Sequence, residues 1–240
     1  MQTLNGRKTA ILGGTGDIGR ACAALLATRG AEVTIGGRAR QRLAEVGSEL
    51  PDGATTIQVD ATDRDSLSRF YEEAGPIDDL VVTVTRRGGA GPASALAEQD
   101  LVDSFAGKSV AHLQAVALAL PKLDERGSVT LISAGSAQAA LPGTAALAAV
   151  NGAIEAAVPV LARELAPRRI NAVSPGLIET GWWDELPEED RRATFQQFAE
   201  QTPIGRNGTA DDVAHAIGAL IENDYITGIV LPCDGGLRLT

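Results

Sequence analysis

A glycine-rich stretch, residues 13–19, stands near the amino end of the chain between the apolar run Thr9–Leu12 and a helical pattern over Ile18–Arg29. Glycines let the backbone approach a pyrophosphate, and the N–H groups at the start of the following helix point at the anion. The strand–loop–helix context separates such a loop from an ordinary turn. The stretch therefore predicts a dinucleotide-binding loop. Its residues are Gly13, Gly14, Thr15, Gly16, Asp17, Ile18 and Gly19.

The end of the second predicted strand bears on which nicotinamide cofactor binds. A carboxylate there would bond the ribose 2′-hydroxyl of NAD, but this chain has Gly36-Gly37-Arg38, with Arg40 two residues on. A guanidinium suits a 2′-phosphate, which favours NADP(H). The alternative is that Arg38 is only a solvated loop charge.

The third predicted strand ends in Val59-Asp60-Ala61-Thr62. Asp60 could accept a hydrogen bond from an adenine amino group. A plain surface aspartate is a close competitor for this interpretation.

Short β-rich runs alternate with longer Ala- and Leu-rich helical patterns from end to end. Strands separated by ten or more helical residues cannot be hairpins, so they pair in parallel through right-handed crossovers. The pattern predicts an α/β fold, a single doubly wound Rossmann-type domain over residues 1–240 with about seven strands and helices on both faces. The strands are expected at Thr9–Leu12, Glu32–Ile35, Thr55–Val59, Leu80–Val84, Val129–Ile132, Arg169–Val173 and Ile229–Leu231. The helices are expected at Ile18–Arg29, Arg40–Glu49, Arg64–Glu73, Glu98–Leu120, Thr144–Leu165, Glu188–Glu200 and Ala210–Glu222.

The bulk composition narrows the class of partner. Hydrophobic residues make up 44% of the 240 residues and can form a core without disulfides, while a net charge of −10 disfavours nucleic acids and anionic membranes. Apolar stretches such as Ala115–Leu120 are too short to span a bilayer. Cys22 and Cys233 have no metal-ligand spacing. We expect a cytoplasmic protein that binds a small molecule and holds no metal.

These landmarks resemble the classical short-chain dehydrogenase/reductase family over essentially the whole chain. The further matches are Asn171–Gly176, Thr180, Thr227-Gly228 and Asp234–Gly236. The resemblance implies a nicotinamide-dependent oxidoreductase that forms a homotetramer or dimer. It also implies that Pro175, Gly176, Ile178 and Thr180 line the nicotinamide end of the cofactor, and that Thr83, after the fourth strand, binds the cofactor.

The family's catalytic residues do not have their usual types in this chain. The family uses a Tyr as proton donor or acceptor, a Lys four residues later, a Ser thirteen residues before the Tyr, and an Asn on an earlier helix. Counted from the landmarks, these positions fall on Leu147, Asn151, Ala134 and Lys108. The two tyrosines of the chain, Tyr71 and Tyr225, are too distant in sequence from position 147 for an adjusted alignment to place either at the Tyr position. The general acid of ordinary carbonyl reduction is therefore missing.

The Asn and Lys positions are exchanged, since Lys108 stands where Asn is expected and Asn151 where Lys is expected. A buried Lys beside the nicotinamide could act as an acid or an electrostatic stabiliser, although a solvent-facing helix charge is an equal alternative. Ser133 and Ser136 are the hydroxyls nearest to the missing Ser, and each could also be an ordinary strand-end residue. His112 is a second candidate acid, for which a packed or capping role is the alternative.

Three functions remain open. The favoured one is a noncanonical NADP(H)-dependent oxidoreductase with Lys108, Ser133 and Asn151 at the catalytic centre, acting on a small carbonyl or conjugated substrate. The second is a redox-neutral enzyme such as a cyclase, dehydratase or isomerase, and the third is a catalytically dead NADP(H)-binding protein. The segment Gly181–Glu200 comes after a strand end and is expected to form a substrate lid, whose Trp182 and Trp183 favour an apolar or aromatic ligand.

Overall fold

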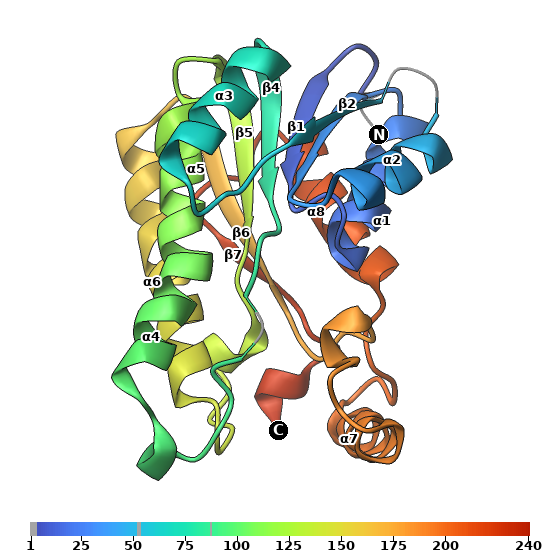
Figure 1. Ribbon diagram of the computed structural model, residues 1–240, viewed down its shortest axis with the longest axis vertical. Coiled ribbons are helices and arrows are strands. Elements are labelled where there is room, and N and C mark those ends of the chain that lie inside the picture. The colour runs from blue at the N-terminus through green and yellow to red at the C-terminus, as the bar shows by residue number, and fades with distance from the viewer. Residues whose placement is uncertain (1–3, 52–53, 87) are drawn as a thin grey trace.

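The chain folds around a parallel sheet of seven strands in the order β3-β2-β1-β4-β5-β6-β7, shown by a computed structural model that describes residues 4–51, 54–86 and 88–240 (Figure 1). This confirms the predicted doubly wound fold. Helices cover both faces of the sheet, and each predicted strand and helix is found at or near its expected place. The strands are β1 (Lys8–Leu12), β2 (Glu32–Gly37), β3 (Thr55–Gln58), β4 (Ile77–Val82), β5 (Leu123–Ile132), β6 (Arg169–Pro175) and β7 (Val230–Cys233). The helices are α1 (Asp17–Thr28), α2 (Arg40–Glu49), α3 (Arg64–Ala74), α4 (Glu98–Phe105), α5 (Ala111–Ala119), α6 (Ala145–Glu164), α7 (Glu188–Gln201) and α8 (Ala210–Glu222).

Strand β1 is the point where the strand order reverses. It pairs in parallel with β2 on one side, where Ala10 lies opposite Thr34, and with β4 on the other, where Ala10 lies opposite Leu80. In open α/β sheets, ligands bind outside the carboxyl ends of the strands at such a switch point. The glycine loop begins one residue after β1, so the fold places it at this position.

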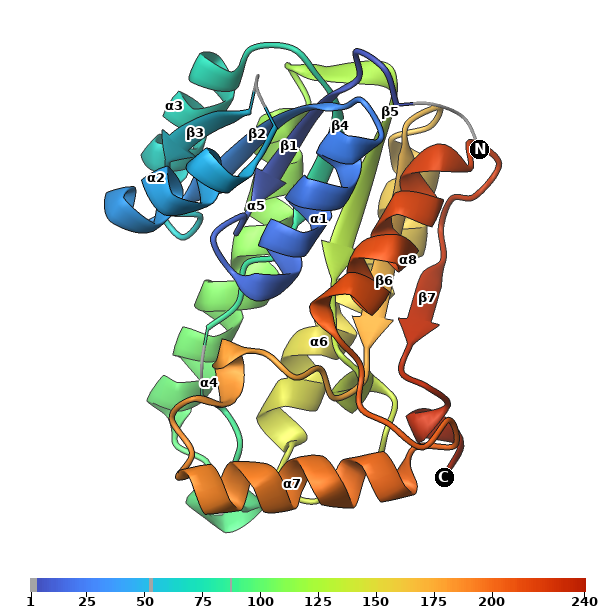
Figure 2. The same cartoon turned by 90° about the vertical axis from the view of Figure 1, so that its right-hand side faces the viewer.

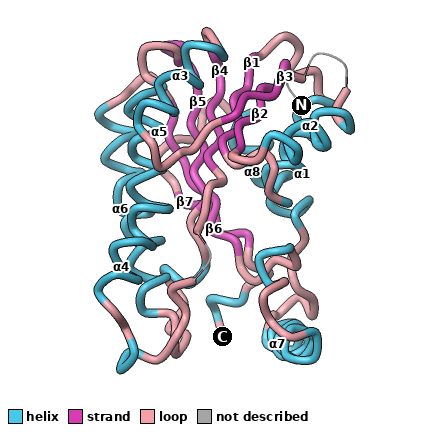
Figure 3. The backbone as a smooth tube through the Cα atoms, in the orientation of Figure 1, coloured by secondary structure: helices cyan, strands magenta, loops and turns pink. Residues whose placement is uncertain are grey.

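The two helical layers bury opposite faces of the same strands. Along β1, Ala10 and Leu12 belong to the core under α3, α5 and α6, whereas Ile11 belongs to the core under α1, α2 and α8. This alternation is the period of two that a strand imposes on its side chains. Figure 3 shows the strands between these two groups of helices. The low aromatic content is sufficient because both cores consist mainly of Ala, Val, Leu and Ile.

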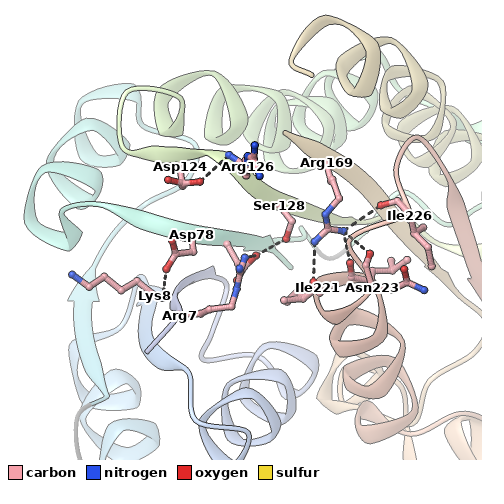
Figure 4. Close-up of polar contacts among 12 residues, drawn as sticks. Arg7, Lys8, Asp78, Asp124, Arg126, Ser128, Arg169, Ile221, Asn223 and Ile226 are labelled. Carbon is pink, nitrogen blue, oxygen red and sulfur yellow. Dashed lines mark hydrogen bonds and ion pairs between the residues drawn. The ribbon is translucent and has the colours of Figure 1, made fainter. Parts of the chain in front are cut away.

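The amino ends of the strands carry a buried polar network (Figure 4). Asp79 on β4 is 0% exposed, and its two oxygens accept hydrogen bonds from Arg7 Nε at 2.9 Å and Arg7 Nη2 at 2.8 Å. Ser128 Oγ on β5 donates to the same carboxylate at 2.6 Å. Because these partners satisfy the buried charge, β4 starts earlier than the hydrophobic run Leu80–Val84 predicts.

Arg169, at the start of β6, fastens the sheet to the end of α8. Its guanidinium donates to the carbonyl oxygens of Leu220, Ile221, Asn223 and Ile226 at 2.6–3.2 Å (Figure 4). The residue is 7% exposed. One buried cation thus satisfies carbonyls that the end of a helix leaves without partners.

Helix α6 is long and apolar enough to cross a membrane by length and composition, with a mean hydropathy of 1.7. The expectation of only short apolar stretches missed it, because Asn151, Glu155 and Pro159 interrupt the run of apolar residues. The helix packs against β6, and its buried side includes Ile154 and Val158. The core helix of a globular domain meets the same criterion of length and hydropathy.

Candidate functional site

The glycine loop is packed too tightly for side chains at several positions. Gly13 has a φ of +86°, which L side chains rarely adopt. A Cβ on Gly14 would lie 2.7 Å from Cβ of Ile35, and one on Gly19 would overlap the carbonyl oxygen of Gly13. At Gly16, by contrast, a Cβ would meet only the oxygen of Gly13 at 3.5 Å, so this side of the loop is open. The N-cap residue of α1, Gly16, has no side chain to cap the first turn. The loop and helix start therefore fit a pyrophosphate.

Asp17, the first residue of α1, joins the loop to the segment that follows β6. Its Oδ2 accepts a hydrogen bond from the backbone N–H of Gly181 at 2.7 Å. A carboxylate in the first turn stabilises the helix but repels a phosphate. The bond to Gly181 directs this charge toward the residues after Thr180.

Beyond β2, the two arginines differ in their surroundings. Arg40 Nε donates to Gln58 Oε1 at 2.6 Å. Arg38 is exposed, and in the part of the chain that the structure describes no hydrogen bond or ion pair engages its guanidinium. Asp60 accepts from the N–H and hydroxyl of Thr62 at 2.9 and 2.7 Å, and these bonds, with the charge of Arg38, lower its pKa. Arg38 is therefore the cation best placed for a 2′-phosphate, and Ala61 beside Asp60 is buried.

The predicted nicotinamide end lies where β1, β4 and β6 finish. Thr83 packs against the loop and donates to the carbonyl oxygen of Leu12 through both its N–H and its hydroxyl. A Cβ on Gly176 would lie 2.9 Å from Cα of Asp234. Ile178 forms a parallel bridge with Gly208. Pro175 ends β6, and Thr180 precedes the next helical turn.

A shallow, open depression of about 390 Å³ lies between the start of α1 and the segment after Thr180. Both the glycine-loop side, through Asp17, and the predicted nicotinamide side, through Thr180, contribute to its wall. Its lining residues are Asp17, Glu179, Thr180, Gly181, Asp184, Arg191 and Phe195.

The predicted lid segment forms a short 3-10 turn, Gly181–Trp183, and then α7. Helix α7 lies beyond the carboxyl ends of β5 and β6 and runs across this end of the molecule (Figure 2). Trp183 donates its Nε1–H to the carbonyl oxygen of Ile178 at 2.9 Å. Its ring packs edge-on against that of Phe195, with the ring centroids 6.0 Å apart. Trp182 packs edge-on against Trp183. One indole therefore anchors the segment instead of facing a ligand freely.

Lys108 lies in a π-helical turn, Ala106–Val110, between α4 and α5. Its Nζ donates to the carbonyl oxygen of Ser133, at the end of β5, at 3.1 Å. Burial lowers the pKa of Lys108 to about 8, and the carboxylate of Glu155 opposes that shift. The ammonium thus points into the site, which disfavours the alternative of a solvent-facing helix charge.

Asn151, predicted to stand at the position of the family's Lys, lies on α6 and is 2% exposed. Its Nδ2 donates to Ser136 Oγ at 3.2 Å and to the carbonyl oxygen of Leu147 at 2.8 Å. Its Oδ1 is buried and has no hydrogen-bond partner among the described residues. An orphaned acceptor at this position fits a ribose hydroxyl of a bound dinucleotide. Ala134 and Leu147 supply no hydroxyl there.

His112 is 0% exposed and packs in the core. Its Nδ1 and Nε2 face the carbonyl oxygens of Lys108 and Val82 at 2.8 and 3.1 Å. Burial and the charge of Lys108 lower the pKa of His112 to about 3, so the ring is neutral at pH 7. The geometry favours the packing role over that of an acid.

Glu155 is the polar residue of this region that the sequence analysis missed. It lies one helical turn after Asn151 on α6, and its carboxylate accepts hydrogen bonds from Ser133 Oγ at 2.7 Å and Ser174 Oγ at 2.9 Å. The spacing of four residues from the family's Lys position was the available signal, because residues four apart share a helix face. No family landmark includes this position.

A sequence model described as enoyl-(acyl carrier protein) reductase, from the short-chain dehydrogenases/reductases, matches residues 14–238. The chain belongs to the short-chain dehydrogenase/reductase family. Among curated relatives, the mouse (Mus musculus) 3-oxoacyl-[acyl-carrier-protein] reductase is 31% identical over 96% of this chain and 98% of its own. The reductase FabG of Thermotoga maritima is 30% identical over 98% of both chains.

Solved structures agree with the family. A small-chain dehydrogenase in complex with NADPH is 30% identical, with a TM-score of 0.86, over 98% of this chain and all of that one. A short-chain dehydrogenase/reductase from Serratia marcescens is 26% identical, with a TM-score of 0.89, over 99% of this chain and all of that one. The resemblance seen in the sequence is thus confirmed, and the protein is of the oxidoreductase family that binds nicotinamide dinucleotides.

Proposed function

We propose that the protein is an NADP(H)-dependent oxidoreductase that works without the family's tyrosine and uses Lys108 as its proton donor. The observation that carries this proposal is the inward-facing ammonium of Lys108 at Ser133, in a chain whose Tyr and Lys positions are Leu147 and Asn151. The cofactor preference is supported by the exposed, unengaged Arg38 and by the relative in complex with NADPH.

The site residues divide the work. The loop from Gly13 to Gly19 and the start of α1 would hold the pyrophosphate, and Arg38 the 2′-phosphate. Asn151 Oδ1 would accept from a ribose hydroxyl. The bound nicotinamide supplies or accepts a hydride. Lys108, whose pKa lies near 8, is mostly protonated at pH 7 and can give a proton from Nζ to the substrate oxygen.

The substrate class follows from what is missing. Lys108 is held at a backbone carbonyl, and Leu147 has no proton to share, so a substrate that needs little proton assistance suits the site best. We propose a small apolar or aromatic compound with a carbonyl or a conjugated acceptor. The segment 181–200 would act as its lid over a single domain, in a homo-oligomer located in the cytoplasm.

Calorimetric titration of the purified protein with NADPH, and with NADH alongside, tests the cofactor part. We expect micromolar binding of NADPH and weaker binding of NADH. Failure of both cofactors to bind would refute an oxidoreductase function. A substrate screen that follows NADPH absorbance, with Lys108→Ala as the comparison, tests the chemistry. Turnover without a change in absorbance would instead indicate a redox-neutral enzyme. The absence of any turnover would indicate a catalytically dead protein.

A further inference from the structure

The carboxylate of Glu155 is held by three neutral donors. Ser133 Oγ and Ser174 Oγ donate to its Oε1 at 2.7 and 2.9 Å, and Gln138 Nε2 donates to its Oε2 at 2.9 Å. These donors come from the ends of β5 and β6 and from the turn after β5. The carboxylate is therefore fixed at the carboxyl edge of the sheet, beside the site and not on the outer surface of α6.

Ser133 joins this carboxylate to Lys108. Its hydroxyl donates to Glu155 while its carbonyl oxygen accepts from Lys108 Nζ at 3.1 Å. The two charged groups do not form an ion pair within 4 Å among the described residues, yet they lie on two sides of one residue that is 1% exposed. A partly buried carboxylate that lacks a direct cationic partner is costly, and the ammonium nearby offsets part of that cost.

The other charged and titratable groups around Lys108 have partners of their own or are neutral. On the outer side of the π-helical turn, Arg86 forms an ion pair with Asp103 at 2.9 Å. On α5, His112 is neutral at pH 7. Among the residues that the structure describes, Glu155 on α6 is thus the charged group that acts on Lys108 within the site.

We propose that Glu155 is a positioning residue that, through Ser133, keeps Lys108 protonated and directed at the substrate site. The proposal rests on the function proposed for Lys108 and assigns a role to a carboxylate outside the family's catalytic set. During reduction of a carbonyl, a bound nicotinamide cofactor would supply the hydride for the new C–H bond, and Lys108 would give a proton from Nζ to the substrate oxygen as its N–H bond breaks. The neutral amine left behind regains a proton from water, a step that the nearby negative charge favours.

The pKa of Lys108 is the direct readout. The chain has three lysines, Lys8, Lys108 and Lys122, so a protein labelled with ¹³C-lysine gives few Cε signals. The signal that is missing in Lys108→Arg is that of Lys108. In the wild type we expect that signal to titrate near pH 8. Glu155→Gln removes the negative charge, and the midpoint should fall by about one pH unit, the lower end of the range for a nearby opposite charge.

Two further variants make the test decisive. Glu164→Gln makes the same change at an exposed position on the same helix and should leave the Lys108 midpoint unchanged. Ser133→Ala removes one of the three donors to Glu155 but keeps the carbonyl that holds Lys108. Because Ser174 and Gln138 still hold the carboxylate, the midpoint should fall by less than in Glu155→Gln. Ser133→Ala decides the question alone if Glu155→Gln does not fold.

An unchanged Lys108 midpoint in the folded variants would overturn the proposal and leave Glu155 as a tie between β5 and β6. This titration needs neither cofactor nor substrate, so its failure is separate from failure of the proposed oxidoreductase function. If NADPH does not bind but the midpoint still falls, the coupling of Glu155 and Lys108 stands while the reaction proposed for it does not.

Discussion

Replacing Arg38 with Gln removes the exposed guanidinium beyond β2 while keeping a side chain of similar length. Two unit charges 4 Å apart in water interact by about 1 kcal/mol. A phosphate carries a charge of about −1.5 to −2 at pH 7. Because Arg38 is exposed, the value in water applies, and the loss is about 1.5–2 kcal/mol. The Kd for NADPH should therefore rise by about tenfold to thirtyfold.

Calorimetric titration with NADPH and NADH measures this effect, and NADH serves as the internal control because it lacks the 2′-phosphate. The matched variant is Arg40→Gln, two residues away, where Nε is already engaged by Gln58. We expect Arg40→Gln to weaken NADPH binding less than Arg38→Gln does. Equal losses for NADPH and NADH in Arg38→Gln, or no loss for NADPH, would show that Arg38 does not contact the 2′-phosphate.

Two further predictions concern buried cations. Arg169→Met leaves four carbonyl oxygens at and just after the end of α8 without their donor, and we expect it to lower the free energy of unfolding in urea by about 3–5 kcal/mol. The exposed Arg163→Met should change this free energy little, and a loss below about 1 kcal/mol for Arg169→Met would contradict the capping role. For Lys108, the folded pKa of about 8 lies below the ordinary 10.5, so the unfolded chain binds more protons between these values and wild-type stability should rise with pH across that window. The free energy of unfolding of the wild type, relative to that of Lys108→Met, should be lowest below pH 8 and should rise as the pH approaches 10.5. If chemical unfolding gives a constant difference between the two proteins from pH 7 to 10.5, Lys108 is not desolvated.

The fold was predictable because local patterns and tertiary packing agree. The glycine loop between Thr9–Leu12 and α1, and the alternation of strands and helices, are set by short-range physics that the sequence displays directly. Strand ends were less predictable. In the sequence, the charge of Asp79 predicts the end of a strand. In the structure, its carboxylate accepts hydrogen bonds from Arg7 and Ser128, both remote in sequence, so the strand includes it.

The site was predictable only where a spacing rule existed. Counting from landmarks predicted that Lys108 and Asn151 lie near each other, and the structure places them within hydrogen-bond distance of Ser133 and Ser136, just after β5. Counting gave no sign of Glu155, whose donors, such as Ser174, lie on separate elements, nor of the contact between Asp17 and Gly181. Such contacts depend on how distant elements meet, which no single stretch of sequence encodes.

Cations that hold elements of the fold together lie at both ends of the sheet, and this has a consequence for protein engineering. At the amino end, the half-buried Arg7 binds Asp79 on β4 and the buried Arg169 binds the end of α8, both away from the glycine loop. Substitutions at the carboxyl end, where Lys108 and Leu147 lie, leave those ties in place. New side chains at the carboxyl end, away from Glu155 and the residues that hold it, can therefore be screened for new reactions without removing the ties made by Arg7 and Arg169.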